Sequence, residues 1–320
     1  MFSKLTHRIM FLSIVSMIML LVVPFLGVNL VSPEQIFQQS EISELVLNYR
    51  IPRMLLGYFA GAILALSGLS FQSIFSNPLA TPYTLGIAGA ASLGAILAMY
   101  VGWSNLVVPA MAMALFSTVL MYVFSRKQNW NETHKVLLTG VALNMLFSSG
   151  ILFVQFQFDY LDTFKILHWL VGSIQNISWG SVGLLAIVLL VGLVVLLLNV
   201  RTLDLLSLGE EFALSKGVHV GKVRWQFISL NALLVGTVVS LLGPIGFIGL
   251  MVPNVMRFWL GASHASLIWG CALGGGLILL LADLVARNAC YPIEVPVGVF
   301  TSFIGAIFFL HLVSKPHDRV

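Results

Sequence analysis

Long apolar stretches alternate with short polar or turn-rich gaps along almost the whole chain. Most stretches approach the roughly 20 residues that an α-helix needs to cross a bilayer. The pattern predicts ten membrane-spanning helices, which we place at residues 9–28, 53–75, 84–101, 105–125, 134–156, 178–199, 224–243, 246–260, 266–286 and 298–313. The chain is therefore expected to be all-α and to form one polytopic helical bundle over residues 1–320.

Composition supports lipid as the solvent of this bundle. Of the 320 residues, 59% are hydrophobic and 9% are charged, with a mean hydropathy of +1.00. A soluble domain carries about 25% charged residues, so a chain this poor in charge could not solvate its own surface in water. The net charge of +4 does not indicate nucleic-acid binding, because the basic residues lie singly between apolar stretches.

The basic residues also orient the helices. With the N-terminus inside, twelve of the 16 lysines and arginines fall on the inner side and four fall on the outer side. This satisfies the positive-inside rule, and leaving out the short eighth helix would move Lys315 and Arg319 outside. Lys4 and Arg8 precede the first apolar stretch, but no small-residue cleavage site follows it. We therefore expect a retained first helix rather than a signal peptide.

Two outer segments are more than simple loops. Residues 32–50 mix acidic and apolar positions, and Ser32-Pro33-Glu34 is a plausible helix start with proline in the first turn. This segment predicts an amphipathic helix lying on the outer face. Residues 162–176 are too short and too polar to span. They predict a half-helix packed against the bundle, because lipid does not tolerate exposed irregular backbone.

Arg50 and Arg53 flank the expected start of the second helix at the outer face. Pro52 between them biases the preceding residue toward extended backbone. Cations are unfavourable at a helix N-terminus, so these arginines need another role. They either anchor the helix by snorkelling to the interface or receive carboxylates of an outer partner. Asp283 and Arg287 are four residues apart and predict an ion pair, unless Arg287 joins the other two arginines.

Two segments rich in proline and glycine interrupt the apolar pattern. Residues 77–82 read Asn-Pro-Leu-Ala-Thr-Pro and predict a rigid connection on the inner side, either a plain turn or a gate. Residues 243–249 indicate backbone that bends within protein, at a tight reversal or along a path. Cys271 and Cys290 would lie roughly 28 Å apart on one helix, so we expect packing residues and no disulfide. No Cys/His spacing indicates a metal site.

A short charged island at residues 207–217 separates two long apolar helices. Such an island at a membrane exit predicts a docking surface for a soluble partner. The following glycines and Lys222 superficially resemble a phosphate-binding loop, but the spacing is one residue short and Val223 replaces the required Ser or Thr. No carboxylate falls at the centre of a predicted helix, which disfavours an ion-coupled secondary transporter. No hydrolase motif indicates an enzyme.

Several ordered segments are shared with a known family. They are Arg50-Ile51-Pro52-Arg53, Gly68-x-x-x-Gln72, Asn77-Pro78-Leu79-Ala80-x-Pro82, residues 85–91, Leu208-Gly209-Glu210-Glu211-x-Ala213, and residues 243–253, 282–287 and 294–298. Together they resemble the permease subunits of the FecCD family of ABC importers, which serve iron siderophores, haem and cobalamin. The resemblance runs from about residue 45 to about residue 312 and implies the fold of a type II ABC importer permease.

The resemblance implies roles for three groups of residues. The coupling helices that enter the cleft of an ATPase match residues 205–220, with Leu208, Gly209, Glu210, Glu211, Ala213 and Gly217. The outer positions that receive acids of a substrate-binding protein match Arg50, Arg53 and Arg287. The inner gate matches Asn77, Pro78, Leu79, Thr133 and His134. Asn254 stands where the family often has histidine, which leaves the role of that position open.

The resemblance also implies partners and a location. An ABC ATPase dimer binds ATP and magnesium and hydrolyses ATP, so this chain is expected to bind no cofactor and to be no enzyme. A periplasmic or lipid-anchored substrate-binding protein docks outside, and a second permease subunit, identical or paralogous, completes the channel. The protein is expected to lie in the bacterial inner (cytoplasmic) membrane, with both termini in the cytoplasm. Ferric siderophore is the expected substrate, and haem and cobalamin are the alternative substrates. The rival functions are a secondary transporter and a membrane-embedded enzyme or scaffold.

Overall fold

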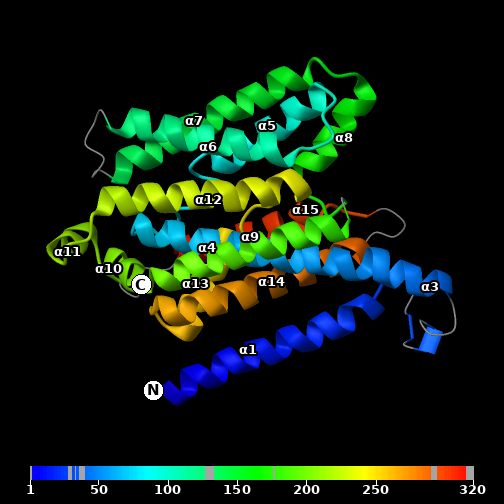
Figure 1. Ribbon diagram of the computed structural model, residues 1–320, viewed down its shortest axis with the longest axis horizontal. Helices are drawn as coiled ribbons and strands as arrows, with labels where there is room; N and C mark the ends of the chain where they lie inside the picture. The colour runs from blue at the N-terminus through cyan, green and yellow to red at the C-terminus, as the bar shows by residue number, and fades with distance from the viewer. Residues whose placement is uncertain are drawn as a thin grey trace.

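The computed structural model describes residues 2–27, 31–32, 34–35, 40–126, 133–175, 177–289 and 294–314. These residues form helices and no strand, which confirms the all-α prediction (Figure 1). The elements are α1 (Phe2–Val22), η1 (Val23–Phe25), α3 (Ser40–Leu45), η2 (Val46–Arg50), α4 (Ile51–Ile74), α5 (Ile87–Tyr100), α6 (Val107–Arg126), α7 (Thr133–Gln155), α8 (Tyr160–Leu170), α9 (Trp179–Leu198), α10 (Val200–Ser207), α11 (Glu210–Ser215), α12 (Val220–Leu242), α13 (Ile248–Leu260), α14 (His264–Ala289) and α15 (Val297–Ser314).

A helix is present at each of the ten predicted ranges, as α1, α4, α5, α6, α7, α9, α12, α13, α14 and α15. Seven described helices are long and apolar enough to cross a membrane, and α5, α13 and α15 are shorter. Some boundaries differ from the prediction: α1 begins at Phe2 instead of residue 9, and α12 begins at Val220 instead of residue 224. Helical backbone continues beyond the apolar stretch there, and hydrophobic length alone does not place such polar ends.

The helices run side by side, so the bundle has two ends (Figure 1). One end carries the start of α1 together with the short helices α10 and α11, and we call it the coupling end. The opposite end carries α3 and α8, and we call it the rim end. The two predicted groups of partner-binding residues therefore lie at opposite ends of the molecule.

α4 is the central helix, and almost all of its residues are buried. It packs against α14 so closely that a Cβ added at Gly61 would collide with the backbone of Gly275, and the reverse also holds. We call this contact the glycine seam. Gly68 approaches Gly249 at the start of α13 in the same way. Small residues let helix backbones touch in this manner within a membrane bundle.

α4 begins at Ile51, between Arg50 and Arg53 as predicted, but the extended backbone expected before Pro52 is wrong. α3, η2 and α4 follow one another directly, and the helical backbone continues from Ser40 to Ile74. Ile51 has φ −66° and ψ −50°, which is helical and not extended. The π-helical turn η2 explains how Pro52 fits, because this turn already departs from the i→i−4 bonding that proline would break. Both arginines therefore lie inside a long helix.

Irregular backbone precedes two of the shorter helices. Residues 75–86 lead into α5 and residues 243–247 lead into α13, which confirms both predicted breaks. Gly243 has φ 71° and Phe247 has φ 67°, in the left-handed region that residues other than glycine rarely adopt. Much of this backbone is buried among helices, so its polar groups do not have to face lipid.

The short helix α8 confirms the predicted half-helix, although it covers Tyr160–Leu170 rather than residues 162–176. Ile166 and Trp169 are buried against the bundle, whereas Phe164 is exposed. The N–H of Ser173 donates to the carbonyl of Leu242 at 2.8 Å, which ties this segment to the end of α12. Structure that does not span the membrane is therefore packed on the rim end of the bundle.

Two expectations fall partly outside the described residues. The predicted amphipathic helix at residues 32–50 is helical from Ser40 onward, whereas residues 33 and 36–39 are not described. Cys271 is buried on α14 and forms no disulfide in the described part of the chain, as expected for a packing residue. Cys290 lies outside the described residues, so its role stays a prediction.

Candidate functional site

The charged island at the coupling end folds into two short helices, α10 and α11, joined by a sharp turn. Gly209 in the turn has φ 116° and Gly217 after α11 has φ 81°, and such values favour glycine. The helices cover 200–207 and 210–215, so the predicted range of 205–220 is displaced toward the C-terminus. The reason is that α10 starts almost directly where α9 ends, before the charged island begins.

The turn and α11 present apolar side chains next to charges. Leu208 is 68% exposed and Phe212 is 43% exposed, whereas Ala213 is fully buried against the bundle. Glu211 is exposed on the same helix, and the Nζ atom of Lys216 lies 5.6 Å from the centre of the Phe212 ring. Exposed apolar residues rimmed by charges are typical of a protein docking surface.

Glu210 has a different position from Glu211, because it points back to the bundle. Its Oε2 atom accepts a hydrogen bond of 3.2 Å from Nη2 of Arg224 on α12. The Arg224 side chain is only 2% exposed, and its guanidinium lies 5.4 Å from the centre of the Phe75 ring. A buried arginine needs such partners. Glu210 therefore anchors α11 to α12, a role that the sequence motif did not indicate.

The predicted gate residues 77–79 form a tight turn directly after α4. The Oδ1 atom of Asn77 accepts the N–H of Leu79 at 2.9 Å, and the Asn77 carbonyl accepts the N–H of Ala80 at 3.1 Å. Leu79 is exposed near the tip of the turn. Thr133 and His134 are the first residues of α7, and their side chains lie outside the described part of the chain.

Asn254 on α13 holds this turn in place. Its Nδ2 atom donates to the carbonyl of Pro78 at 3.2 Å and to the carbonyl of Leu250 at 2.7 Å. Arg257, one helical turn further, donates to Oε1 of Gln72 on α4 and lies 3.4 Å from Oδ1 of Asn254. The gate turn is thus fastened to α13 by a residue whose role the sequence left open. Its signals in the sequence were a polar side chain within an apolar helix and a position where the family often has histidine.

An apolar cavity of about 170 Å³ lies behind the gate segment. Thr81 and Tyr83 line it from one side, and Phe247 and Leu250 line it from the start of α13. Protein interiors are normally packed without such space. A loop backed by a cavity can shift without first displacing tightly packed side chains.

The three predicted docking arginines meet at the rim end. Arg50, Arg53 and Arg287 line one pocket of about 380 Å³ together with Glu294. Arg53 binds two carboxylates, because its Nη2 lies 2.9 Å from Oδ1 of Asp283 and its Nη1 lies 2.8 Å from Oε2 of Glu294. The sequence did not identify Glu294 as a partner, although it lies within a family motif.

The expected ion pair between Asp283 and Arg287 is only marginal. Nε of Arg287 lies 4.0 Å from Oδ2 of Asp283, because Arg53 already contacts that carboxylate through both Nε and Nη2. Arg50 donates instead to the carbonyl of Pro24 at 3.2 Å. Three arginines (+3) and two carboxylates (−2) leave a formal charge of +1 around the pocket. The arrangement can therefore attract an acidic group of another molecule.

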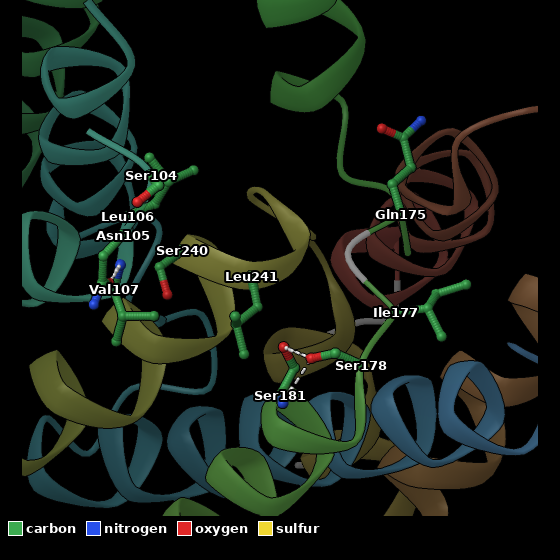
Figure 2. Close-up of a pocket in the computed structure, with 10 residues that line it drawn as sticks. All are labelled: Ser104, Asn105, Leu106, Val107, Gln175, Ile177, Ser178, Ser181, Ser240 and Leu241. Carbon is green, nitrogen blue, oxygen red and sulfur yellow. Dashed lines mark hydrogen bonds between the residues drawn. The ribbon is translucent and has the colours of Figure 1, made fainter. Parts of the chain in front are cut away.

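A larger pocket of about 540 Å³ opens between the connection of α5 to α6, the start of α9 and the end of α12 (Figure 2). Hydroxyls and amides dominate its lining: Ser104, Asn105, Gln175, Ser178, Ser181 and Ser240. Figure 2 shows Ser178 facing Ser181, with 2.9 Å between their Oγ atoms, and Ser178 also caps α9 by accepting the N–H of Ser181 at 3.1 Å. Among the described residues, those that line it include no acid, no base and no histidine.

The described residues also offer no metal centre, because no three of their His, Cys, Asp or Glu side chains are grouped closely enough to hold an ion. What the described residues do offer is an exposed apolar patch next to charges at one end, a pocket lined by three arginines at the other, and a bonded turn between helices near the coupling end.

Comparison with known proteins agrees with this arrangement. The FecCD transport family model matches residues 12–315. The chain is 38% identical over 280 residues to the vitamin B12 import system permease protein BtuC of Vibrio cholerae, covering 86% of this chain and 84% of the relative. It is 36% identical over 281 residues to the hemin transport system permease protein HmuU of Yersinia pestis, covering 85% and 84%. It is 37% identical over 280 residues to the Fe(3+) dicitrate transport system permease protein FecD of Escherichia coli, covering 84% and 85%.

A solved structure described as an inward-facing conformation of a metal-chelate type ABC transporter has the same fold. The TM-score is 0.89 at 31% identity, and the match covers 97% of this chain and 100% of the other. The family match spans nearly the whole chain, and the relatives are permeases matched over most of their length. The chain therefore belongs to the FecCD transport family and is a permease subunit of an ABC importer.

Proposed function

We propose that this permease carries a ferric siderophore across the bacterial cytoplasmic membrane by alternating access, driven by a separate ABC ATPase dimer. The observation that carries the proposal is the pair α10 and α11 at the coupling end, which exposes Leu208 and Phe212. The same pair is bonded into the bundle through Glu210 and Arg224. A surface that is exposed on one side and bonded to membrane helices on the other is what an external ATPase needs in order to move them.

The rim pocket supports docking of a periplasmic or lipid-anchored substrate-binding protein. Its formal charge of +1 favours an acidic partner, and such charge pairs steer encounter more than they add affinity. Arg53 already holds two carboxylates, and Glu294 is the more exposed of these, at 60% against 3% for Asp283. We therefore propose that an acid of the binding protein displaces Glu294 from Arg53, while Asp283 keeps its contact.

A second permease subunit, identical or paralogous, would complete the channel. α7 exposes Leu138, Met145 and Phe153, and α15 exposes Phe303 and Leu310. Lipid can cover such side chains, and so can the apolar face of a second subunit. We propose that part of these two helices forms the subunit contact and that the path for a large chelate runs between the two permeases.

The first part of α1 supports an assignment of membrane sides. It lies at the same end as α10 and α11, so an ATPase bound to the short helices places the N-terminus in the cytoplasm. α15 begins near the rim end, where the N–H of Gly298 donates to the carbonyl of Gly172 at 3.0 Å, and then runs back. We therefore propose that both termini are cytoplasmic. A fluorescent reporter that works only in the cytoplasm should give a signal when it is fused to either terminus.

The choice of substrate depends on family membership rather than on a residue. The relatives named for vitamin B12, hemin and ferric dicitrate are 38%, 36% and 37% identical, so identity does not separate the three classes. Haem and cobalamin are the alternatives to a ferric siderophore. Uptake assays with ferric citrate, a ferric hydroxamate, haemin and cyanocobalamin would decide, and exclusive uptake of haemin or cyanocobalamin would contradict the proposal.

The main experiment is reconstitution of this chain with its ATPase and binding protein in proteoliposomes. ATP hydrolysis is measured with and without loaded binding protein, in the wild type and in Glu211→Lys and Arg50→Glu variants. Glu211→Lys is preferable to a change at Glu210, because Glu210 also holds the buried Arg224 and its loss could unfold α11. Lys165→Glu is the control, because Lys165 is an exposed cation on α8 and does not line the rim pocket.

Three results of this experiment would be informative. The loaded binding protein should stimulate ATP hydrolysis in the wild type and in the control. Loss of this stimulation in both variants would support both docking faces. Stimulation that is indifferent to both variants would contradict the coupling and rim assignments. Uptake driven by a proton gradient without ATP would favour an ion-coupled secondary transporter instead.

A further inference from the structure

The short helices at the coupling end are both linked to the segment where α4 ends, α10 directly and α11 through Arg224 of α12. Ser76, just after α4, donates its hydroxyl to the carbonyl of Leu206 on α10 at 2.7 Å. Arg224, which holds Glu210 of α11, donates through Nε to the carbonyl of Ile74 at 3.4 Å. Two separate links from the coupling helices thus reach Ile74 and Ser76, at the end of α4 and just after it.

A third connection runs through a buried histidine. Oδ1 of Asp204 on α10 accepts the backbone N–H of His264 at 2.9 Å and lies 2.7 Å from its Nδ1 atom. On the other side of the ring, Nε2 of His264 lies 2.5 Å from Oγ of Ser73 on α4. His264 is the first residue of α14, so α10, α14 and α4 are joined by one line of polar atoms.

Burial excludes a catalytic role for these atoms. Asp, His and Ser in this order also form the proton relay of serine hydrolases. His264 and Ser73 are each only 1% exposed, so an ester or amide substrate cannot reach the serine hydroxyl. Ser73 also lies on a helix, with Oγ 2.8 Å from the carbonyl of Leu69. The line of polar atoms therefore serves to hold three helices in one geometry.

Buried polar contacts of this kind move together. Breaking the contact at either ring nitrogen would leave a buried polar group without its partner, which costs more than the bond contributes when intact. A displacement of Asp204 with α10 therefore carries His264 and Ser73 along. The residues that follow Ser73 by a few positions are the gate turn at Asn77 and Leu79.

We propose that Ser73 and His264 are positioning residues that transmit a movement of α10 to the gate turn through the end of α4. Ser76 lies between them and the gate with φ 46°, in the left-handed region that a serine rarely adopts. This strained residue sets the direction in which the chain leaves α4, and its side chain is bonded to α10. The inference rests on the proposed function, because it assumes that an ATPase moves α10 and α11.

The test asks whether the gate turn responds to ATP in the full complex with the ATPase and binding protein. Leu79→Cys is introduced at the exposed turn, Cys290 is replaced by serine, and the rate of maleimide labelling is measured with and without ATP plus vanadate. Ser73→Ala removes the hydroxyl. His264→Asn keeps a group that can meet Asp204 but is too short to reach Ser73. Both changes leave the exposed patch of α11 untouched.

Ser92→Ala is the matched control. Ser92 is a buried serine on α5 whose hydroxyl donates within its own helix, to the carbonyl of Ala88 at 2.9 Å. We expect ATP to change the labelling rate in the parent and in this control. We expect that change to shrink at least about fivefold in Ser73→Ala and in His264→Asn, the lower end of typical coupling between linked sites. The double variant should be no worse than the stronger single variant, because both interrupt one path.

The outcomes distinguish failure of the transmission role from failure of the proposed function. A parent complex that hydrolyses ATP, with an unchanged labelling response in Ser73→Ala, overturns the transmission role alone. A parent complex that does not hydrolyse ATP overturns the proposed function and the transmission role with it. Ser73→Ala removes one oxygen atom and decides the case if His264→Asn fails to assemble. Loss of the labelling response with ATP hydrolysis retained is the result that a merely stabilising contact would not produce.

Discussion

Replacing Asp283 with alanine should destabilise the rim end strongly. The Asp283 side chain is 3% exposed and accepts hydrogen bonds from Nε and Nη2 of Arg53 at 3.2 and 2.9 Å. Without this carboxylate, Glu294 is the remaining acid identified in the pocket that Arg53 and Arg287 line. Two guanidinium groups would then repel each other at a site with little access to water.

The size of the effect follows from the burial of this pair. Removing one partner of a buried ion pair typically costs about 3–5 kcal/mol of unfolding free energy. We expect the lower end, about 3 kcal/mol, because Arg53 keeps its 2.8 Å contact with the exposed Glu294. At about 2 °C per kcal/mol for a chain of this length, the Tm should fall by roughly 6 °C.

Thermal unfolding of the purified permease in detergent, followed by tryptophan fluorescence, measures this shift. Asp162→Ala is the control, because Asp162 and Lys165 form a 2.9 Å pair with exposures of 52% and 77%. An exposed pair contributes about 1 kcal/mol or less. Adding Arg53→Met to Asp283→Ala should recover part of the loss, since it removes the uncompensated charge. Equal shifts for Asp283→Ala and Asp162→Ala would refute the reasoning and show that water screens the rim pocket.

Other substitutions test other parts of the bundle. Gly275→Leu should abolish the folded-protein peak on size exclusion, because any side chain there meets the backbone of Gly61. Gly183→Leu is the control and should fold, because the space around Gly183 is open. Equal yields of the two variants would contradict the close packing at the glycine seam. Phe212→Glu should weaken co-purification of the ATPase about tenfold or more, as expected for a buried interface aromatic, with permease yield unchanged. Asn254→Ala should speed maleimide labelling of a cysteine in the gate turn, and Asn254→His should restore slow labelling by returning a donor; equal rates in both would exclude a fastening role.

The ten helices could be predicted because apolar length is a local property of the sequence. The same local reasoning failed at Pro52, where the usual rule for the preceding residue predicted extended backbone. That rule considers the steric clash of one dipeptide, whereas the π-helical turn η2 adjusts five residues at once to keep the helix continuous. The start of α10 at Val200 was missed for a related reason, since nothing in the hydrophobic pattern separates it from α9.

The site residues were predictable only where a family motif marks them. Arg50, Arg53 and Arg287 do meet in one pocket, as their shared role required. Their partners and the links at the coupling end depend on which helices face each other. The contact of His264 with Asp204 joins residues 60 positions apart, and its contact with Ser73 joins residues 191 positions apart. The periodicity of a sequence indicates which face of a helix is apolar. It does not indicate which other helix packs against that face.

The pairing of α4 with α14 has a mechanical consequence. Arg53 and Ser73 lie 20 residues apart on α4, about 30 Å along the axis, and their partners Asp283 and His264 lie at the two ends of α14. The glycine seam leaves no room for the two backbones to slide between these contacts. The pair therefore acts as a single rigid beam across the membrane. We therefore expect a displacement of the rim arginines to shift the coupling end of this pair as well, and the remaining helices to move around the pair rather than bend it.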